Sequence, residues 1–131
     1  MYMLDTNICI YIMKRKPISV LERLRTLEPG SVCMSLVTLG ELEYGALRSN
    51  NPTGALSLLK RLGEHIPVLG LEASVATHYA QIRANLAVRG TAIGNNDLWI
   101  AAHAQATGAT LVTNNLREFE RVESLTLQNW A

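Results

Sequence analysis

The alternation of short apolar runs with longer amphipathic segments predicts strands separated by helices. Mostly apolar runs occupy 1–4, 32–35, 67–71 and 109–113, and each is followed by polar residues that open a turn or a helix. Strands buried on both faces read as continuous apolar runs, whereas half-exposed strands alternate. The pattern therefore predicts an α/β fold with three layers (α/β/α), in which helices cover a central parallel sheet of four to five strands.

The helices expected between these strands have recognisable ends. They span about 8–14, 17–28, 36–47, 53–65, 72–88 and 97–106, and a short stretch at 125–127 is a candidate fifth strand. Asn114 and Asn115 are expected to form a turn. No repeat, low-complexity segment or linker interrupts the chain, so a single domain is expected over residues 1–131.

Composition and charge exclude several classes of protein. A formal net charge of +1 excludes a strongly basic nucleic-acid coat protein. Cys9 and Cys33 have no CxxC partner or nearby ligand histidines, which excludes a zinc site and indicates a reducing, cytoplasmic setting. The longest apolar run, Ile8 to Met13, is far shorter than a membrane span, and no targeting segment is recognised.

The two aspartates of the chain stand where carboxylates are informative. Asp5 directly follows the first strand, at the carboxyl edge of the predicted sheet, where α/β proteins bind ligands. An N-cap role is the alternative for Asp5, although Thr6 would serve as well. Asp97 shares a helical stripe with Ile100, Ala101 and Ala104, and no Lys or Arg nearby in sequence would compensate a buried charge there.

A third carboxylate is expected from the helix after the second strand, where Glu41 and Glu43 compete. Periodicity mildly prefers Glu43 as the inward residue, because it aligns with Leu36, Leu39 and Leu47. Thr113 and Asn115 follow a later strand and present oxygens to the same edge, with a simple Asn-rich turn as the alternative.

Three converging carboxylates without histidine or cysteine favour a hard divalent cation. Mg²⁺, which Mn²⁺ can replace, takes oxygen ligands, keeps several waters and bridges to phosphate. The matching chemistry is metal-assisted hydrolysis of a phosphodiester.

The only run of like charge is Lys14-Arg15-Lys16. It fits either the solvated end of a helix, favoured by the helix dipole, or a contact with RNA phosphates.

Four blocks of sequence, taken together, resemble PIN-domain ribonucleases and, among them, the VapC toxins of bacterial type II toxin–antitoxin modules. The blocks are MLDTN at 3–7, GELEYGA at 40–46, IGNNDLWIAA at 93–102 and LVTNN at 111–115 with Phe119 beyond it. They occur in order and cover essentially the whole chain.

The resemblance assigns roles to individual positions. Asp5 and Asp97 match the principal metal-binding acids, and Glu41 rather than Glu43 matches the acid of the middle motif, so Asp5, Glu41 and Asp97 are the expected catalytic residues and metal ligands. Thr6 matches a supporting hydroxyl residue, and Thr113 is expected to support the site as well. Asn115 departs from the pattern, because many PIN domains have a fourth acid there; it is expected to hold water or substrate instead.

The function implied by this resemblance is that of a cytoplasmic, Mg²⁺-dependent endoribonuclease that stops translation by cutting structured RNA. A tRNA anticodon stem-loop is the expected target, with initiator tRNA favoured. The implied partners are a second copy of the chain, in a homodimer, and a VapB-type antitoxin that covers the acidic site and carries the contact with operator DNA. Lys14, Arg15 and Lys16 are the candidate RNA-binding residues.

Two other enzyme classes are disfavoured. A phosphoaspartyl hydrolase of the haloacid dehalogenase type needs a second Asp where Asn7 stands, and a response-regulator receiver needs paired acids and a late Lys. The non-enzymatic alternative is a catalytically weak PIN-fold interaction module whose acids bind an Arg-bearing peptide or RNA, and retention of all three acids argues against it.

Overall fold

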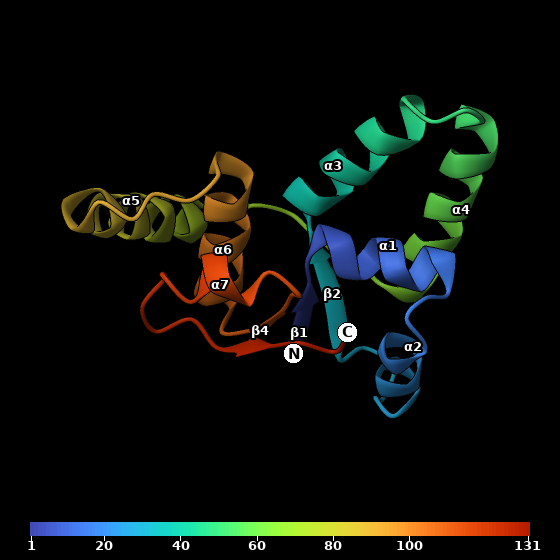
Figure 1. The fold of residues 1–131 in the computed structure, drawn as a ribbon, viewed down its shortest axis with the longest axis horizontal. Helices are drawn as coiled ribbons and strands as arrows, with labels where there is room; N and C mark the ends of the chain where they lie inside the picture. The colour runs from blue at the N-terminus through green and yellow to red at the C-terminus, as the bar shows by residue number, and fades with distance from the viewer.

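The computed structural model describes residues 1–131 and shows a five-stranded sheet with helices on both faces (Figure 1). The strands are β1 (Tyr2–Leu4), β2 (Val32–Ser35), β3 (Val68–Leu69), β4 (Thr110–Val112) and β5 (Leu127–Gln128). The helices are α1 (Thr6–Lys14), α2 (Ile18–Arg25), α3 (Leu36–Leu47), α4 (Pro52–His65), α5 (Ala73–Arg89), α6 (Asn95–Thr107) and α7 (Leu116–Phe119).

The sheet is parallel throughout, as the continuous apolar runs predict. The strand order is β3-β2-β1-β4-β5, so β1 lies in the centre between β2 and β4. Met3 is paired with Cys33 on one side and with Leu111 on the other. The expected fold class is confirmed, and none of the helices is both long and apolar enough to span a lipid bilayer.

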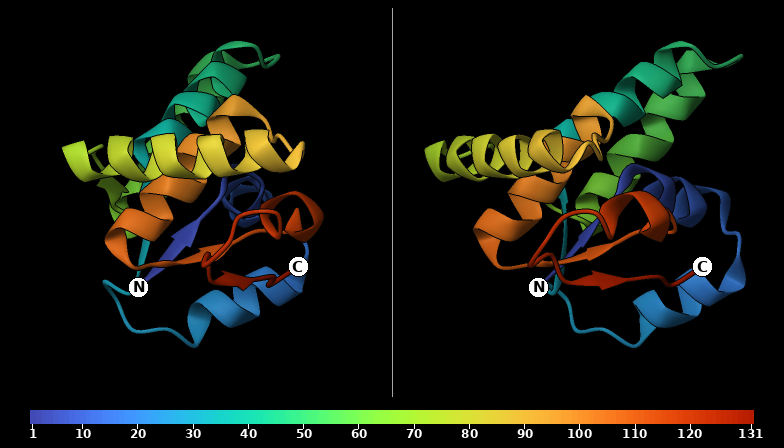
Figure 2. Two further views of the ribbon diagram at one scale, coloured as in Figure 1. Left: turned by 90° about the vertical axis from the view of Figure 1, so that its left-hand side faces the viewer. Right: turned by 60° about the vertical axis from the view of Figure 1, so that its left-hand side comes forward.

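Alternating residues of each strand belong to two separate hydrophobic cores, one on each face of the sheet. Met3, Cys33 and Leu111 pack with α5 and α6 on one face, whereas their neighbours Leu4 and Val112 pack with α1, α2 and α4 on the other. Figure 2 shows α5 lying across α6 on one side of the sheet and α2 on the opposite side. Both faces are covered, which explains why the strands lack polar alternation.

The structure differs from the sequence-based expectation at a few ends. Helix α6 begins at Asn95, two residues before Asp97, and α7 follows the expected turn at Asn114 and Asn115 in a stretch where no helix was expected. The edge strands β3 and β5 have two residues each, and such short edges leave few backbone groups open to pairing with another chain.

The topology brings distant segments to one edge of the sheet. The chain leaves β1, β2 and β4 at their carboxyl ends, which point the same way in a parallel sheet. Helix α6 returns the chain to β4 and therefore begins at this edge and runs away from it. The residue after β1, the first two turns of α3, the first turn of α6 and the residue after β4 consequently meet there.

Candidate active site

Asp5 is the innermost acid of this edge. Only 6% of its surface is exposed, and its Oδ1 accepts the N–H of Ile8 at 3.0 Å, so it caps α1. The Thr113 hydroxyl donates a hydrogen bond to the same carboxyl. Burial outweighs these hydrogen bonds and raises the pKa of Asp5, with a further rise from the nearby charge of Glu41. The N-cap and the candidate site residue are thus the same carboxylate.

Glu41 joins the cluster from α3 and is held by two donors. Thr6 Oγ1 donates to its Oε1 at 2.5 Å, and Asn96 Nδ2 approaches its Oε2 at 3.4 Å. Glu43 is exposed on the same helix. The periodicity preference for Glu43 is wrong, because α3 leaves several of its apolar side chains in solvent and its apolar face does not mark its buried face.

Asp97 lies in the first turn of α6 and is half-buried, whereas Ile100, Ala101 and Ala104 of its predicted stripe are buried. Its carboxyl shares a hydrogen bond with Glu118. Burial, this hydrogen bond and the charges of Glu118, Glu41 and Asp5 together raise the pKa of Asp97 to about 7. Asp97 is therefore the more easily protonated of the two carboxyls.

Glu118 is a fourth carboxylate that the sequence reasoning missed. It lies on α7, where its Oε1 accepts the N–H of Gly94 at 2.9 Å and its Oε2 accepts Asn115 Nδ2 at 2.6 Å. Although burial alone would raise its pKa, the hydrogen bonds from Gly94, Asp97 and Asn115 lower it. The only sequence signal for Glu118 was its position three residues after Asn115, which places the two on the same side of a helix. Helix α7 has four residues and is too short to show a periodic pattern.

The supporting residues are arranged around these acids. Thr113 is buried, and its Oγ1 accepts the N–H of Asn115 at 2.9 Å. Thr6 Oγ1 lies 3.5 Å from Thr38 Oγ1 as well as contacting Glu41. Asn115, where the resemblance led us to expect an acid in many relatives, donates to Glu118, so Glu118 places a carboxylate beside the uncharged Asn115.

The four acids have no basic partner in contact. The only salt bridge of the protein joins Arg89 to Glu123, outside the cluster. No three His, Cys, Asp or Glu side chains are gathered closely enough to enclose a metal ion. The arrangement is an open set of oxygen donors, suited to a cation held by one or two carboxylates and completed by water.

An open hollow gives access to the cluster. One part, of about 410 Å³, is lined by Glu41, Asn96 and Asp97, and another, of about 550 Å³, by Thr6, Glu41, Tyr44 and Asn96. The shared residues Glu41 and Asn96 make the two parts continuous.

An apolar groove of about 400 Å³ adjoins this hollow. It lies between α1, α3 and α4 and also includes Glu41. The carboxylates therefore lie between an open polar hollow and an apolar groove.

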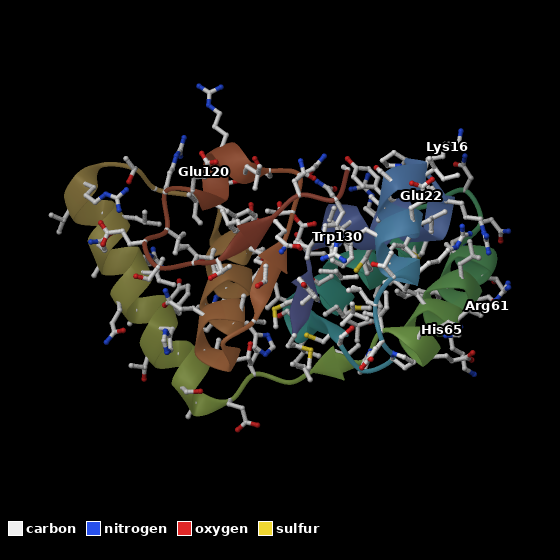
Figure 3. The ribbon with its side chains drawn as sticks, turned by 90° about the horizontal axis from the view of Figure 1, so that it is seen from below. Lys16, Glu22, Arg61, His65, Glu120 and Trp130 are labelled. Carbon is white, nitrogen blue, oxygen red and sulfur yellow. The ribbon has the colours of Figure 1, made fainter.

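The basic cluster lies at the other end of α1. Lys14 lines the apolar groove, nine residues or about 14 Å along the helix from Asp5. Arg15 caps the helix with φ of 59°, and Lys16 is exposed. Figure 3 shows Lys16 at the α1–α2 end of the molecule, far from Glu120, which follows α7. The structure does not bring these cations into contact with the acids.

Comparison with known proteins identifies relatives along the full length. A family profile described as PIN domain matches residues 2–125. The chain is similar to the tRNA(fMet)-specific endonuclease VapC of Shigella flexneri, with 48% identity over 130 residues, 99% of this chain and 98% of that protein. It is also similar to ribonuclease VapC2 of Haemophilus influenzae, with 43% identity over 129 residues, 98% of this chain and 97% of the relative.

A solved structure gives the same result. The crystal structure of VapBC2 from Rickettsia felis bound to a DNA fragment from their promoter contains a chain that superposes with a TM-score of 0.94 at 39% identity, covering 99% of this chain and 98% of that one.

Proposed function

Because this chain belongs to the PIN domain family and, within it, to the VapC ribonucleases, we propose that it is the toxin of a type II toxin–antitoxin pair and a metal-dependent endoribonuclease that hydrolyses phosphodiester bonds in structured RNA. The observation that carries the proposal is the convergence of Asp5, Glu41 and Asp97 at one edge of the sheet with no salt-bridge partner, where burial above all, and the neighbouring carboxylates in addition, raise the pKa of Asp5 and Asp97. A cation among these carboxylates would reverse both shifts.

The donor set fits a hard divalent ion. Carboxylate, hydroxyl and amide oxygens surround the hollow, and no histidine or cysteine is among its lining residues. We propose Mg²⁺ as the ion, with Mn²⁺ able to replace it, and Asp5, Glu41 and Asp97 as the acids that hold it, one or two of them directly and the rest through bound water. Such an ion, when bound, acidifies a water ligand and offsets the charge that develops on the phosphate.

The protein's own groups orient these ligands. Thr6 fixes one oxygen of Glu41 by its hydrogen bond and leaves the other toward Asn96. Thr113 and the Ile8 N–H hold Asp5. Glu118 is restrained by hydrogen bonds from Gly94 and Asn115 and accepts a hydrogen bond from protonated Asp97. When Asp97 loses this proton, its carboxylate would be free to bind the ion. We assign Glu118 as the fourth carboxylate of the site.

The proposed substrate is a tRNA anticodon stem-loop, with initiator tRNA favoured, since the Shigella relative is named for that tRNA. Unpaired loops expose the sugar–phosphate backbone to an open site, and a folded RNA is recognised by shape with few charges. Lys14, Arg15 and Lys16 are the proposed phosphate contacts. The reaction would take place in the cytoplasm, where tRNA functions.

The proposed partners follow from the same surface. An apolar segment of a VapB-type antitoxin lying in the groove between α1, α3 and α4 would bring an adjacent basic side chain to Glu41, which the groove shares with the carboxylate cluster. Operator DNA would be bound through the antitoxin, and the toxin would act as a homodimer. The exposed Leu36, Tyr44 and Leu47 give α3 an apolar face for such contacts.

The decisive experiment is incubation of the purified protein with total cellular RNA and Mg²⁺ or Mn²⁺, followed by mapping of new 5′ ends. We expect new ends at a few sites with the wild type and none with Asp97→Asn, whose amide still hydrogen-bonds Glu118 and preserves the fold. Equal cleavage by the two proteins would contradict the active-site assignment. A wild type that cuts no RNA with either ion would contradict the function.

A further inference from the structure

A separate pocket opens beside the start of α6, on the side away from the apolar groove. It has a volume of about 280 Å³, and its apolar part is formed by Leu86, Ile93 and Leu98. Its rim includes Arg83 and Asn95. Asn95 also lines the hollow beside Asp97, so the pocket continues directly from the carboxylate cluster.

The polar groups at the rim are fixed by a relay of hydrogen bonds. Arg83 donates to the hydroxyl of Tyr79 at 2.6 Å, and that hydroxyl donates to Asn95 Oδ1 at 2.9 Å. Tyr79 is itself held by stacking on Trp99, with ring centroids 3.9 Å apart and 9° between the planes. Because the carbonyl of Asn95 is occupied, its amide NH₂ and the remaining guanidinium N–H groups of Arg83 are the donors left for a ligand.

The positive charge at this rim is only partly offset by the protein, since Arg121 lies close enough to Glu118 for its charge to lower the pKa of that carboxyl. Arg83 forms no salt bridge, and Arg121, which donates to the carbonyl of the rim residue Ala92 at 3.0 Å, forms none either. Positive charge therefore flanks the acidic cluster at this side. A ligand that contacts both these cations and the pocket beside them needs an anionic group next to an apolar group that accepts hydrogen bonds.

We propose that this pocket binds one unpaired nucleobase of the RNA substrate, close to the phosphate that lies at the carboxylate cluster. The proposal rests on the ribonuclease function proposed above. Unpaired bases are recognised by stacking on apolar, aromatic or guanidinium surfaces and by hydrogen bonds at their edges. Every base presents an acceptor edge to the donors of Arg83 and Asn95, and the adjoining phosphates meet Arg83 and Arg121. The volume lies just below the range of about 300–1,000 Å³ for pockets of drug-sized ligands, so it fits one planar base.

The test fills the pocket without touching the carboxylates. Ala87 is exposed at the rim, and Ala84 lies on the same helix, is also exposed and is not part of the pocket. We expect Ala87→Phe to raise the KM for the best-cut RNA about tenfold, the size of one lost base contact, with kcat and Mn²⁺ affinity unchanged. Ala84→Phe should leave KM unchanged. Arg83→Gln, which removes the donors without adding bulk, should raise KM similarly and alter the base preference around the mapped cut sites.

The outcomes separate the two proposals. A wild type that cuts no RNA contradicts the proposed function and the base pocket with it. An active wild type with the same KM and cut sites in Ala87→Phe and Arg83→Gln contradicts the base pocket alone and leaves the pocket to a side chain of a protein partner. An equal rise in KM in Ala84→Phe and Ala87→Phe also contradicts it, because bulk on α5 would then be the cause.

Discussion

His103 on α6 and Ser35 at the start of α3 are joined by a buried hydrogen bond, with His103 Nδ1 2.7 Å from Ser35 Oγ. Their exposed fractions are 1% and 0%. Ser35 Oγ also accepts the N–H of Val37 and so caps α3, which leaves its hydroxyl proton for His103. Burial lowers the pKa of His103, whose ring also contacts the backbone of Gly70, so the ring is neutral near pH 7.

This bond connects the two helices that carry Asp97 and Glu41. Asp97 precedes His103 by six residues, and Glu41 follows Ser35 by six, so each acid is about 9 Å along its helix from the bond. The link therefore helps to set the separation of the two carboxylates.

Replacing His103 should weaken both stability and activity. His103→Ala leaves the buried hydroxyl of Ser35 without an acceptor and opens a cavity, so we expect the free energy of unfolding to fall by about 1–3 kcal/mol for the unsatisfied group, and further for the cavity. We also expect a lower kcat for RNA cleavage at saturating Mg²⁺. Urea denaturation and steady-state kinetics measure the two effects.

His65→Ala is the matched control, because His65 is exposed on α4 (Figure 3). His103→Gln, which retains an acceptor and a donor, should restore part of the kcat. If His103→Ala has the kcat of His65→Ala once both are fully folded, the link does not position the site.

The two glutamates of α3 should differ sharply in their effect on cleavage. Glu41→Gln removes a carboxylate that Thr6 and Asn96 hold in the cluster, so we expect a loss of at least about 100-fold, more than metal sites lose with a supporting residue. Glu43→Gln on the exposed face should retain full activity. The kcat/KM of the two variants is measured on the same RNA. Equal losses in both would show that cleavage depends on the total charge of α3 and not on Glu41 as a ligand.

The sheet and its carboxyl edge could be predicted from the sequence because each depends on local pattern. A mostly apolar run followed by a polar residue marks both the strand and the edge, which is why Asp5 was recognised. Asp97 was recognised from the helical stripe that it shares with Ile100, Ala101 and Ala104. The choice between Glu41 and Glu43 could not be made from periodicity, because α3 leaves Tyr44 and Leu47 exposed and its apolar face misleads.

Glu118 and His103 could not be assigned from pattern for a different reason. The contacts of Glu118 are with Gly94, 24 residues earlier, and with Asp97, and those of His103 are with Ser35, 68 residues earlier. Such contacts depend on how α6 and α7 pack at the edge of the sheet. A four-residue helix such as α7 carries no periodicity that would point to them.

The raised pKa of Asp97 makes metal binding and stability depend on pH. The pKa of Asp97 in the folded protein, about 7, lies above its ordinary value of 3.8. Protonated Asp97 therefore contributes to the free energy of unfolding of the metal-free protein: this contribution is complete below about pH 4 and is lost as the pH rises through about 7. We expect Asp97→Asn to be more stable than the wild type at pH 8 without metal, with the difference disappearing toward pH 4. Denaturation at several pH values measures it.

The proton on Asp97 also competes with the metal ion for this carboxylate. We expect the Mn²⁺ affinity of the wild type to rise between pH 6 and pH 8, because Asp97 must lose its proton to act as a ligand. Glu118→Gln removes the negative charge that helps to raise the pKa of Asp97 and leaves only a weaker, neutral acceptor, so it should move this rise to lower pH. Calorimetric titration of both proteins would contradict the coupling if their affinities followed the same pH profile.

Neutralising the basic cluster should weaken RNA binding without affecting the chemistry. Lys14, Arg15 and Lys16 end α1, about 14 Å from Asp5, and have no carboxylate partner. If all three contact phosphates, replacing them together by Gln should reduce the slope of log K against log salt by about 2, since each phosphate contact on a single strand contributes about 0.7. The measurement uses the cleavage-deficient background Asp97→Asn, so that the RNA stays intact, and the Asp97→Asn protein without further substitutions supplies the reference slope. The control is the double variant of Lys60 and Arg61, two exposed cations on α4, of which Figure 3 labels Arg61, and it should keep the full slope. An unchanged slope in the triple variant would mean that the cluster is a solvated helix end, and the phosphate contacts would then have to come from cations such as Arg83 and Arg121 on the other side of the carboxylates.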